Sequence, residues 1–145
     1  MVDDSERFRA ARQLMGSDPM SRHLGFELLE IDEAFAVTRY RPTEEHLTAL
    51  KRVQGGAVFA QADHAIAIAA STLGGTVVTI EVKINFLAPA GAGDVLIAEA
   101  KPLDIKRKLS LWQVEVRKES GQLVAICHGL AYRAQNKSYD ETPSV

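Results

Sequence analysis

The feature that most constrains the fold is a long apolar helix signal followed at once by a strand signal. Residues 57–73 read AVFAQADHAIAIAASTL, and seven of these seventeen residues are alanine, a strong helix former. Apolar residues occupy almost every side of this predicted helix, so we expect it to be buried all round. Gly55-Gly56 and Gly74-Gly75 flank it, as glycines commonly do at the ends of an element.

Strands are predicted on both sides of this helix. Apolar residues from Val78 to Phe86 alternate with polar ones such as Thr79 and Glu81, which is typical of a half-buried strand. The connections between strands are too short for helical crossovers, so the sheet is mainly antiparallel. One apolar helix and one such sheet bury each other best when the sheet curls around the helix, which predicts an α+β fold. The predicted strands cover residues 26–31, 35–41, 78–86, 94–100, 112–117 and 124–132.

The chain length favours one domain covering residues 1–145, because 145 residues is the usual size of a single core. Within it, residues 1–18 are predicted to carry an N-terminal amphipathic helix, and residues 134–145 a flexible tail. A short helical turn is predicted between Pro19 and Gly25.

Charge and cysteine content narrow the function classes. Seventeen Lys and Arg against nineteen Asp and Glu give −2, so no global basic field favours nucleic acid or an anionic membrane. The single Cys127 excludes an internal disulfide and a multi-thiolate metal site, and the four histidines lack metal-ligand spacing, so we expect no metal. The chain lacks a signal-peptide apolar core and a run of ~18 apolar residues, which predicts a cytoplasmic protein.

Asp63 is the main candidate for chemistry. It lies in the middle of the apolar helix, where an ionised carboxylate without a partner is costly. One interpretation is a nucleophile or general base in a crevice. The alternatives are a helix cap, an interface salt bridge or an exposed residue on a one-sided helix, and we favour the functional interpretation.

Two further features have a functional and a structural interpretation. Gly55-Gly56 leaves backbone N–H groups uncovered at the positive end of the helix, a good place for an oxyanion, but the pair also suits a turn that needs positive φ. Lys106, Arg107 and Lys108 lie between two predicted strands, where they either form a solvated loop or meet phosphates.

Three segments in order resemble a known family. They are HLGFELLEI at 23–31, QGGAVFAQAD at 54–63 and TIEVKINFLAPA at 79–90. At this spacing the chain resembles the hotdog-fold acyl-CoA thioesterases, in particular the branch related to phenylacetic-acid degradation. The resemblance covers about residues 19–133 and implies an antiparallel sheet wrapped around a long central helix.

The resemblance also implies a reaction and roles for residues. The reaction is hydrolysis of acyl-CoA thioesters, with Asp63 as the catalytic carboxylate, acting either as nucleophile or by activating water. Gly55 matches the backbone donor that polarises the thioester carbonyl, and Thr79 a position that orients the attacking water. The segment of Lys106, Arg107 and Lys108 loosely matches cations near the coenzyme A phosphates. Coenzyme A enters as part of the substrate, and no separate cofactor is expected.

Two residues depart from the family pattern. The family's histidine before the two glycines is Gln54 here, and the asparagine six residues earlier is Thr48. Gln54 can donate and accept hydrogen bonds but cannot shuttle a proton near neutral pH. These changes favour one alternative, a non-catalytic binder of acyl-CoA or acyl carrier protein. A hydratase or dehydratase on the same fold is the other alternative, although Gln54 weakens it.

Helix geometry predicts that the active site is shared between chains. Asp63 follows Gly55 by eight residues, which is about 12 Å along a helix axis. The attacked carbon must lie roughly 3–3.5 Å from the attacking atom while its oxygen meets the oxyanion donor, so one chain cannot supply both groups. A two-fold partner with an antiparallel helix would do so. The resemblance implies the same homodimer, often paired again into tetramers.

Overall fold

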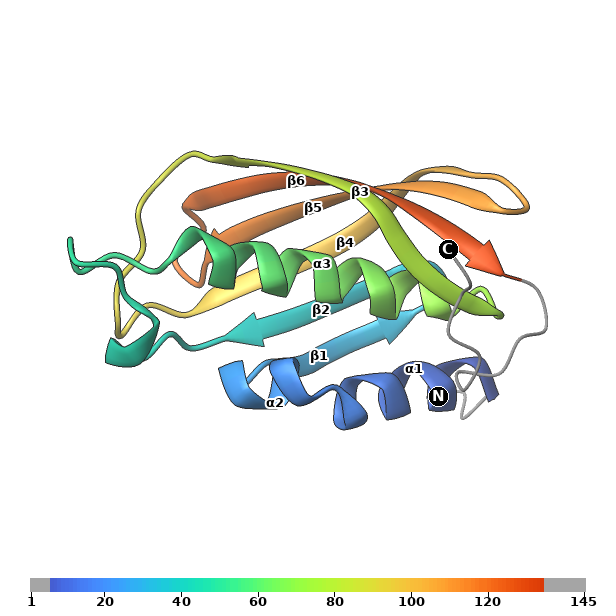
Figure 1. Ribbon diagram of the computed structural model, residues 1–145, viewed down its shortest axis with the longest axis horizontal. Coiled ribbons are helices and arrows are strands. Elements are labelled where there is room, and N and C mark those ends of the chain that lie inside the picture. The colour runs from blue at the N-terminus through green and yellow to red at the C-terminus, as the bar shows by residue number, and fades with distance from the viewer. Residues whose placement is uncertain (1–5, 135–145) are drawn as a thin grey trace.

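The computed structural model describes residues 6–134, which form a curved sheet with one long helix against its concave face (Figure 1). Two shorter N-terminal helices lie beside that helix, at the edge of the sheet formed by the first strand. In chain order the elements are α1 (Glu6–Ser17), α2 (Pro19–Leu24), β1 (Glu27–Asp32), β2 (Phe35–Tyr40), η1 (Glu44–His46), α3 (Gly55–Ser71), β3 (Thr76–Phe86), β4 (Leu96–Ile105), β5 (Leu109–Lys118) and β6 (Leu123–Ala134).

All strands belong to one antiparallel sheet of order β1-β2-β4-β5-β6-β3. The predicted α+β arrangement is therefore confirmed, with all six strands and the central helix in place. β3 follows α3 directly but lies at the far edge, beside β6. This placement leaves one side of β3 without a neighbouring strand among the described residues.

The core lies between α3 and the concave face of the sheet. Residues of β5 such as Trp112, Val114 and Val116 are fully buried there, as the alternation along the strand predicts. On β6 the buried residues are small, and a Cβ placed on Gly129 would lie 2.5 Å from Cδ1 of Ile66 in α3. The glycine therefore allows the helix to approach the sheet closely.

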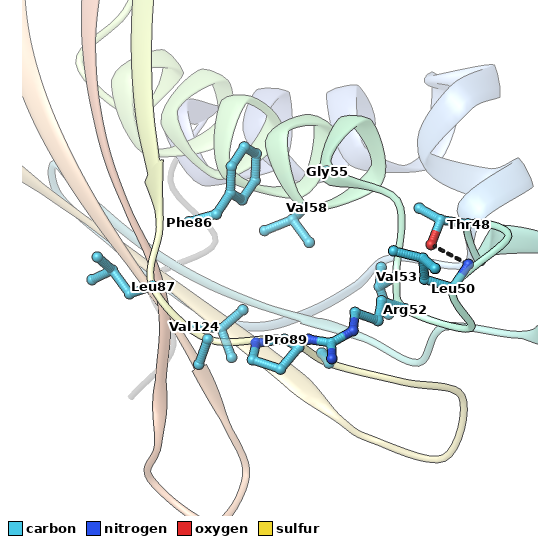
Figure 2. A pocket seen from close by; sticks show the side chains of 12 residues that line it. Thr48, Leu50, Arg52, Val53, Gly55, Val58, Phe86, Leu87, Pro89 and Val124 are labelled. Carbon is cyan, nitrogen blue, oxygen red and sulfur yellow. Dashed lines mark hydrogen bonds between the residues drawn. The ribbon is translucent and has the colours of Figure 1, made fainter.

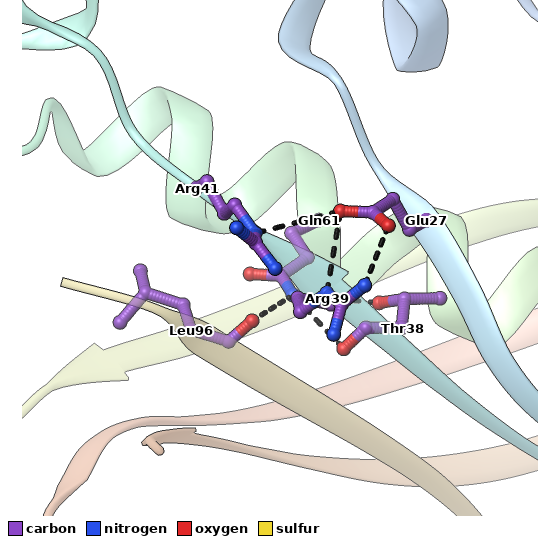
Figure 3. Close-up of polar contacts among 6 residues, drawn as sticks. All are labelled: Glu27, Thr38, Arg39, Arg41, Gln61 and Leu96. Carbon is purple, nitrogen blue, oxygen red and sulfur yellow. Dashed lines mark hydrogen bonds and ion pairs between the residues drawn. The ribbon is translucent and has the colours of Figure 1, made fainter. Parts of the chain in front are cut away.

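Gln61 is a polar anchor on the sheet side of α3. Its Nε2 donates to the backbone oxygen of Leu96 at 3.0 Å and to oxygens of Thr38 at 3.4 Å, which ties the helix to β4 and β2 (Figure 3). Toward solvent, Arg39 of β2 pairs with Glu27 of β1 at 2.6 Å. The hydrogen bond from Arg39 lowers the pKa of Glu27.

The burial of α3 differs from the prediction. The helix begins at Gly55, so the two glycines form its first turn rather than precede it, and it ends at Ser71. Ala60, Asp63 and Ala67 are only partly buried. The expectation of a helix buried all round was therefore wrong, because the sheet covers one face and α1 and α2 leave part of another open.

A bulge breaks the predicted alternation along β3. The pairing with β6 shifts between Thr79 and Glu81. As a result Val78 and Ile80 are exposed, whereas Val82 and Ile84 contact the core. A bulge adds one residue to a strand and redirects the side chains around it.

The N-terminal region contains α1 and α2, and the predicted turn from Pro19 to Leu24 is confirmed. Gly25 ends α2 with a φ of 78°, the left-handed conformation that glycine adopts most readily. Ala134 belongs to β6, and the rest of the predicted tail, 135–145, lies outside the described residues.

Candidate active site

Asp63 is held by Thr79. The hydroxyl of Thr79 donates to Oδ1 of Asp63 at 2.7 Å, joining the middle of α3 to β3. The bulge between Thr79 and Glu81 is the local feature that turns this side chain toward the helix. A carboxylate fixed through one oxygen keeps its second oxygen available for a substrate or a water molecule.

A cavity of about 500 Å³ opens beside Asp63, between α3 and the junction of α1 and α2. Its walls are mostly apolar, with polar groups from Asp63, Ser17, Asp18 and His64. A mainly apolar cavity with few polar groups is the usual form of a small-molecule site.

His64 also borders this cavity and contacts Met15 of α1 and Asp18 between α1 and α2. Its Nδ1 lies 3.4 Å from Oδ2 of Asp18, and its Nε2 lies 2.9 Å from the sulfur of Met15. Burial lowers the pKa of His64, and the carboxylates of Asp18 and Asp63 partly oppose this effect.

Gly55 supplies an open backbone donor. No hydrogen bond of its N–H group is found within residues 6–134, whereas the N–H of Gly56 donates to the side chain of Gln54 at 2.8 Å. Neither glycine has a positive φ, so the turn interpretation of this pair was wrong. A Cβ on Gly55 would lie 3.0 Å from the ring of Phe86, so a larger residue at this position would require that ring to move.

A second cavity, of about 460 Å³, surrounds Gly55 (Figure 2). The loop before α3 contributes Thr48 and Arg52, the end of β3 contributes Phe86, and the segment after β3 contributes Pro89. The Oγ1 of Thr48 accepts the N–H of Leu50 at 3.2 Å, which fixes this side chain within its own turn. Thr48 and Gly55 thus line the same cavity.

Gln54 borders a third cavity, of about 350 Å³, together with His46. The Oε1 of Gln54 caps α3 through Gly56, so this side chain supports the helix start. The Nδ1 of His46 accepts the N–H of Thr43 at 3.2 Å and lies 2.8 Å from the hydroxyl of Tyr40. Burial raises the pKa of Tyr40 to about 12.

The turn that carries Lys106, Arg107 and Lys108 joins β4 to β5 at the opposite end of α3 from Gly55 (Figure 1). The backbone oxygen of Lys108 accepts the N–H of Arg133, whose side chain donates to the oxygen of Gly74 just beyond α3. Lys106 pairs with Asp104 at 3.0 Å. All three cations are exposed.

The predicted catalytic residues therefore divide among separate places within one chain. Asp63 and Thr79 are in contact, Gly55 and Thr48 share a second cavity, and Gln54 borders a third. Arg52 was missed because nothing in its sequence context distinguishes it from an ordinary solvated arginine, and its position beside Gly55 follows only from the folded loop.

Within residues 6–134 the structure shows neither a metal site nor an accessible cysteine. Between residues 6 and 134 there is no group of three or more His, Cys, Asp or Glu side chains that suits a metal ion. Cys127 is buried in β6, and burial raises the pKa of its thiol to about 11. Among residues 6–134, no helix has the length and apolar character needed to cross a membrane.

Comparison with known sequences identifies a family. The thioesterase superfamily profile matches residues 51–125, which include α3 and β3 to β5. An acyl-coenzyme A thioesterase, PaaI of Escherichia coli, is 29% identical over 123 residues, covering 85% of this chain and 88% of the relative.

Solved structures share the fold. The E. coli PaaI structure superposes with a TM-score of 0.86 at 28% identity, covering 88% of this chain and 93% of that one. The TT0310 protein from Thermus thermophilus superposes with a TM-score of 0.77 at 32% identity, covering 81% and 98%. The predicted hotdog fold is confirmed by these neighbours.

Proposed function

This chain belongs to the thioesterase superfamily, and from that premise we propose that it hydrolyses acyl-CoA thioesters to a free acid and coenzyme A. The observation that carries the proposal is the carboxylate of Asp63, fixed by Thr79 at 2.7 Å on the wall of a cavity of about 500 Å³. The similarity to the acyl-coenzyme A thioesterase of E. coli supports the substrate class.

In the proposed reaction, Asp63 either attacks the thioester carbonyl or removes a proton from the water that attacks it. The N–H of Gly55 donates to the carbonyl oxygen as negative charge develops on it. The C–S bond then breaks. When Asp63 acts as a base, the thiolate of coenzyme A takes up the proton that Asp63 removed from water; when Asp63 attacks directly, water hydrolyses the resulting acyl–Asp63 anhydride and supplies that proton. Thr79 orients the carboxylate, or the attacking water, through its hydroxyl group.

We propose secondary roles for the other predicted residues. Gln54 fixes the helix start and thereby the direction of the Gly55 N–H, a role supported by its bond to Gly56. Thr48 shapes the cavity around Gly55, and Lys106, Arg107 and Lys108 attract the phosphates of coenzyme A. The chemistry needs no group beyond the substrate and water. A cytoplasmic location is part of this proposal.

We propose that each active site forms between two chains. Asp63 and Gly55 border different cavities of one protomer and are eight residues apart on one helix, about 12 Å along its axis. A two-fold partner with an antiparallel α3 brings its Gly55 opposite this Asp63. The open edge of β3 supports such pairing, because it exposes Val78 and Ile80 and a long edge strand favours a second strand beside it. Pairing of two such dimers gives the proposed tetramer.

One observation favours a second candidate, a non-catalytic binder of acyl-CoA or acyl carrier protein. The Oε1 of Gln54 is already occupied by Gly56, and an amide cannot protonate a departing thiolate as an imidazolium can. This candidate retains both cavities but predicts no turnover.

Release of free thiol from a panel of acyl-CoAs distinguishes the two functions. We expect turnover by the wild type and a loss of roughly a hundredfold or more in Asp63→Asn, because an amide keeps the size of the side chain but is neither nucleophile nor base. Asp32→Asn is the matched control, since Asp32 is the last residue of β1 and its side chain accepts the N–H of Glu33. Binding without thiol release would assign the protein to the second candidate, and enoyl products would indicate a hydratase.

A further inference from the structure

Arg52 is the one charged residue among those that line the cavity around Gly55. The other walls are apolar side chains and backbone, except for the hydroxyl of Thr48. Figure 2 shows the Arg52 side chain extending from its loop across the cavity toward the wall that carries Pro89. A cation at the rim of an otherwise apolar pocket can bind an anionic group of a ligand and orient it there.

The loop that carries Arg52 is fixed by its own hydrogen bonds. The N–H of Thr48 donates to the oxygen of Arg52 at 2.7 Å, and the N–H of Lys51 donates to the oxygen of Thr48 at 2.9 Å. Lys51 has a φ of 62°, and the N–H of Val53 donates to the oxygen of Ala90 at 2.8 Å on the opposite wall. The base of the Arg52 side chain is therefore held at a defined place on the cavity rim.

Arg52, in the loop before α3, differs from most cations of the sheet because no carboxylate of residues 6–134 pairs with it. Arg39, Lys101 and Arg117 each pair with a glutamate at 2.6 to 2.9 Å. Among the residues from 6 to 134, no ion pair and no side-chain hydrogen bond of Arg52 is found. The guanidinium thus keeps its full set of donors for a ligand.

The cavity has an apolar body and a charged rim. Leu50, at the tip of the loop, is 79% exposed, and Leu87 on the facing segment is 55% exposed. Arg52 is exposed as well, so its head group remains solvated beside them. This combination suits an elongated ligand whose apolar or amide portion lies in the cavity while an anionic end stays near solvent.

We propose that Arg52 binds a phosphate group of the thiol carrier, with the pantetheine arm lying in the cavity that leads to Gly55. This assignment rests on the proposed thioesterase function. An arginine fork matches phosphate oxygens with two parallel hydrogen bonds, and charge-assisted bonds of this kind are the stronger ones. The same phosphate occurs in coenzyme A and on the phosphopantetheine arm of an acyl carrier protein, so both sources contain the group that Arg52 recognises.

A series of thioesters with the same acyl group tests the proposal. Acyl-pantetheine has no phosphate, acyl-4′-phosphopantetheine has one, and acyl-CoA has the pyrophosphate and the ribose phosphate. For Arg52→Gln we expect KM to rise about tenfold with the phosphate-bearing substrates, because a charge-assisted hydrogen bond is lost, with kcat within about twofold. With acyl-pantetheine we expect no change relative to wild type.

Two variants serve as controls. Lys51→Gln removes the same charge from the neighbouring residue, which does not line the cavity, and we expect wild-type KM for all substrates. Arg52→Lys keeps the charge but not the two-pronged geometry, so we expect part of the affinity to return.

The substrate series also separates the sources of the phosphate. An effect already complete with acyl-4′-phosphopantetheine assigns Arg52 to the first phosphate, which coenzyme A and carrier protein share. An effect that appears only with acyl-CoA assigns it to the nucleotide part, which a carrier protein lacks. An equal loss with all three thioesters, or no loss with any, overturns the proposal. Hydrolysis of acyl-pantetheine by the wild type keeps the thioesterase assignment independent of that outcome.

Discussion

The cavity beside Asp63 and the cavity beside Gly55 lie along the same helix, yet they are built in opposite ways. Asp63 lies mid-helix, fixed by a hydroxyl from a bulged strand and enclosed by the N-terminal helices. Gly55 lies at the helix start, where a backbone N–H is left open between a tight loop and the end of β3. One cavity therefore provides a negative group and the other a donor for negative charge.

This difference explains why a single protomer lacks a complete active site. A carbonyl under attack needs a base or nucleophile on one side and a hydrogen-bond donor at its oxygen. The rigid rise of a helix keeps two positions eight residues apart at about 12 Å, so no side-chain rotation joins them. The largest predicted effects therefore come from experiments that combine the two cavities from different chains.

Coexpression of two inactive variants tests the shared site. Asp63→Asn lacks the carboxylate, and Gly55→Val obstructs the donor because a side chain at Gly55 meets Phe86. With random pairing, half of the dimers are mixed and each holds one intact site, so we expect activity to return to roughly a quarter of wild type. Thiol release is measured on the coexpressed mixture and on the tagged and purified mixed dimer, for which one intact site in two predicts about half of wild-type activity.

The same experiment can also refute the shared-site model. Mixed dimers that form but recover no activity, or an active species that sediments as a monomer, would place both groups in one chain. Each variant alone must show a wild-type circular dichroism spectrum, so that lost folding is not mistaken for lost chemistry.

A smaller effect is expected at Thr79, which belongs only to the Asp63 side. Thr79→Val keeps the shape of the side chain but removes the hydroxyl that donates to Asp63 at 2.7 Å. We expect kcat to fall about tenfold with little change in KM, because a charge-assisted hydrogen bond that orients the carboxylate is lost. Thr79→Ser retains the hydroxyl and should restore most of the rate. Equal activity of the Val and Ser variants would show that the carboxylate needs no such support.

The cavity beside Asp63 and the cavity beside Gly55 also differ in how much of each can be predicted from the sequence. The identity of Asp63 and its unusual position follow from the pattern of α3, because a carboxylate among alanines is visible without a structure. Its partner is not visible in that way. Strict alternation along β3 separates Thr79 from Val78 and Ile80, and only the bulge, which depends on pairing with β6, turns Thr79 toward Asp63.

On the Gly55 side, the sequence predicts a helix start but not which amide is open. The side chain of Gln54 accepts the N–H of Gly56 and leaves that of Gly55 open. Which of the two amides it accepts depends on its conformation at the helix end. Likewise, the place of Arg52 depends on a loop closed by Thr48 and on the segment after β3, which lies more than thirty residues away. Elements follow from local periodicity, whereas cavities form where distant segments meet.

Of the two cavities, only the one beside Asp63 contains a residue, His64, through which we expect stability to depend on pH. His64 packs against Met15, Asp18 and Phe26, and its pKa is lowered from the ordinary value of 6.5, chiefly by burial. The unfolded chain therefore binds this proton more readily than the folded one. The contribution of His64 to the free energy of unfolding is fully present above about pH 6.5 and is lost as pH falls below it.

Urea titrations between pH 8 and pH 5 measure this contribution. We expect the fall in the free energy of unfolding over this range to be smaller in His64→Gln than in the wild type, by no more than about 1.4 kcal/mol per pH unit, the limit for one proton. His23→Gln is the control, since His23 lies in the last turn of α2. The protection factors of the amides in α1, which correct for the slower intrinsic exchange at low pH, should fall as the pH is lowered, whereas those in the 47–53 loop should not. Parallel pH profiles for wild type and His64→Gln would contradict the assignment.

The smallest effect is expected at Gln54, because its bond to Gly56 serves the helix start rather than the reacting atoms. Gln54→His restores the residue that the family resemblance places before the two glycines, and a neutral imidazole can also accept the Gly56 N–H. We expect the variant to fold, with stability within about 1 kcal/mol of wild type, as for an exchange of one cap for another. Turnover should be unchanged or up to about threefold higher, because an imidazole can also donate to the carbonyl or the leaving thiolate. Gln54→Ala separates the two contributions, since it removes the cap and adds no donor. A loss of more than about tenfold in a folded Gln54→His variant would mean that the amide itself binds substrate, and the third cavity, with His46, would then join the site.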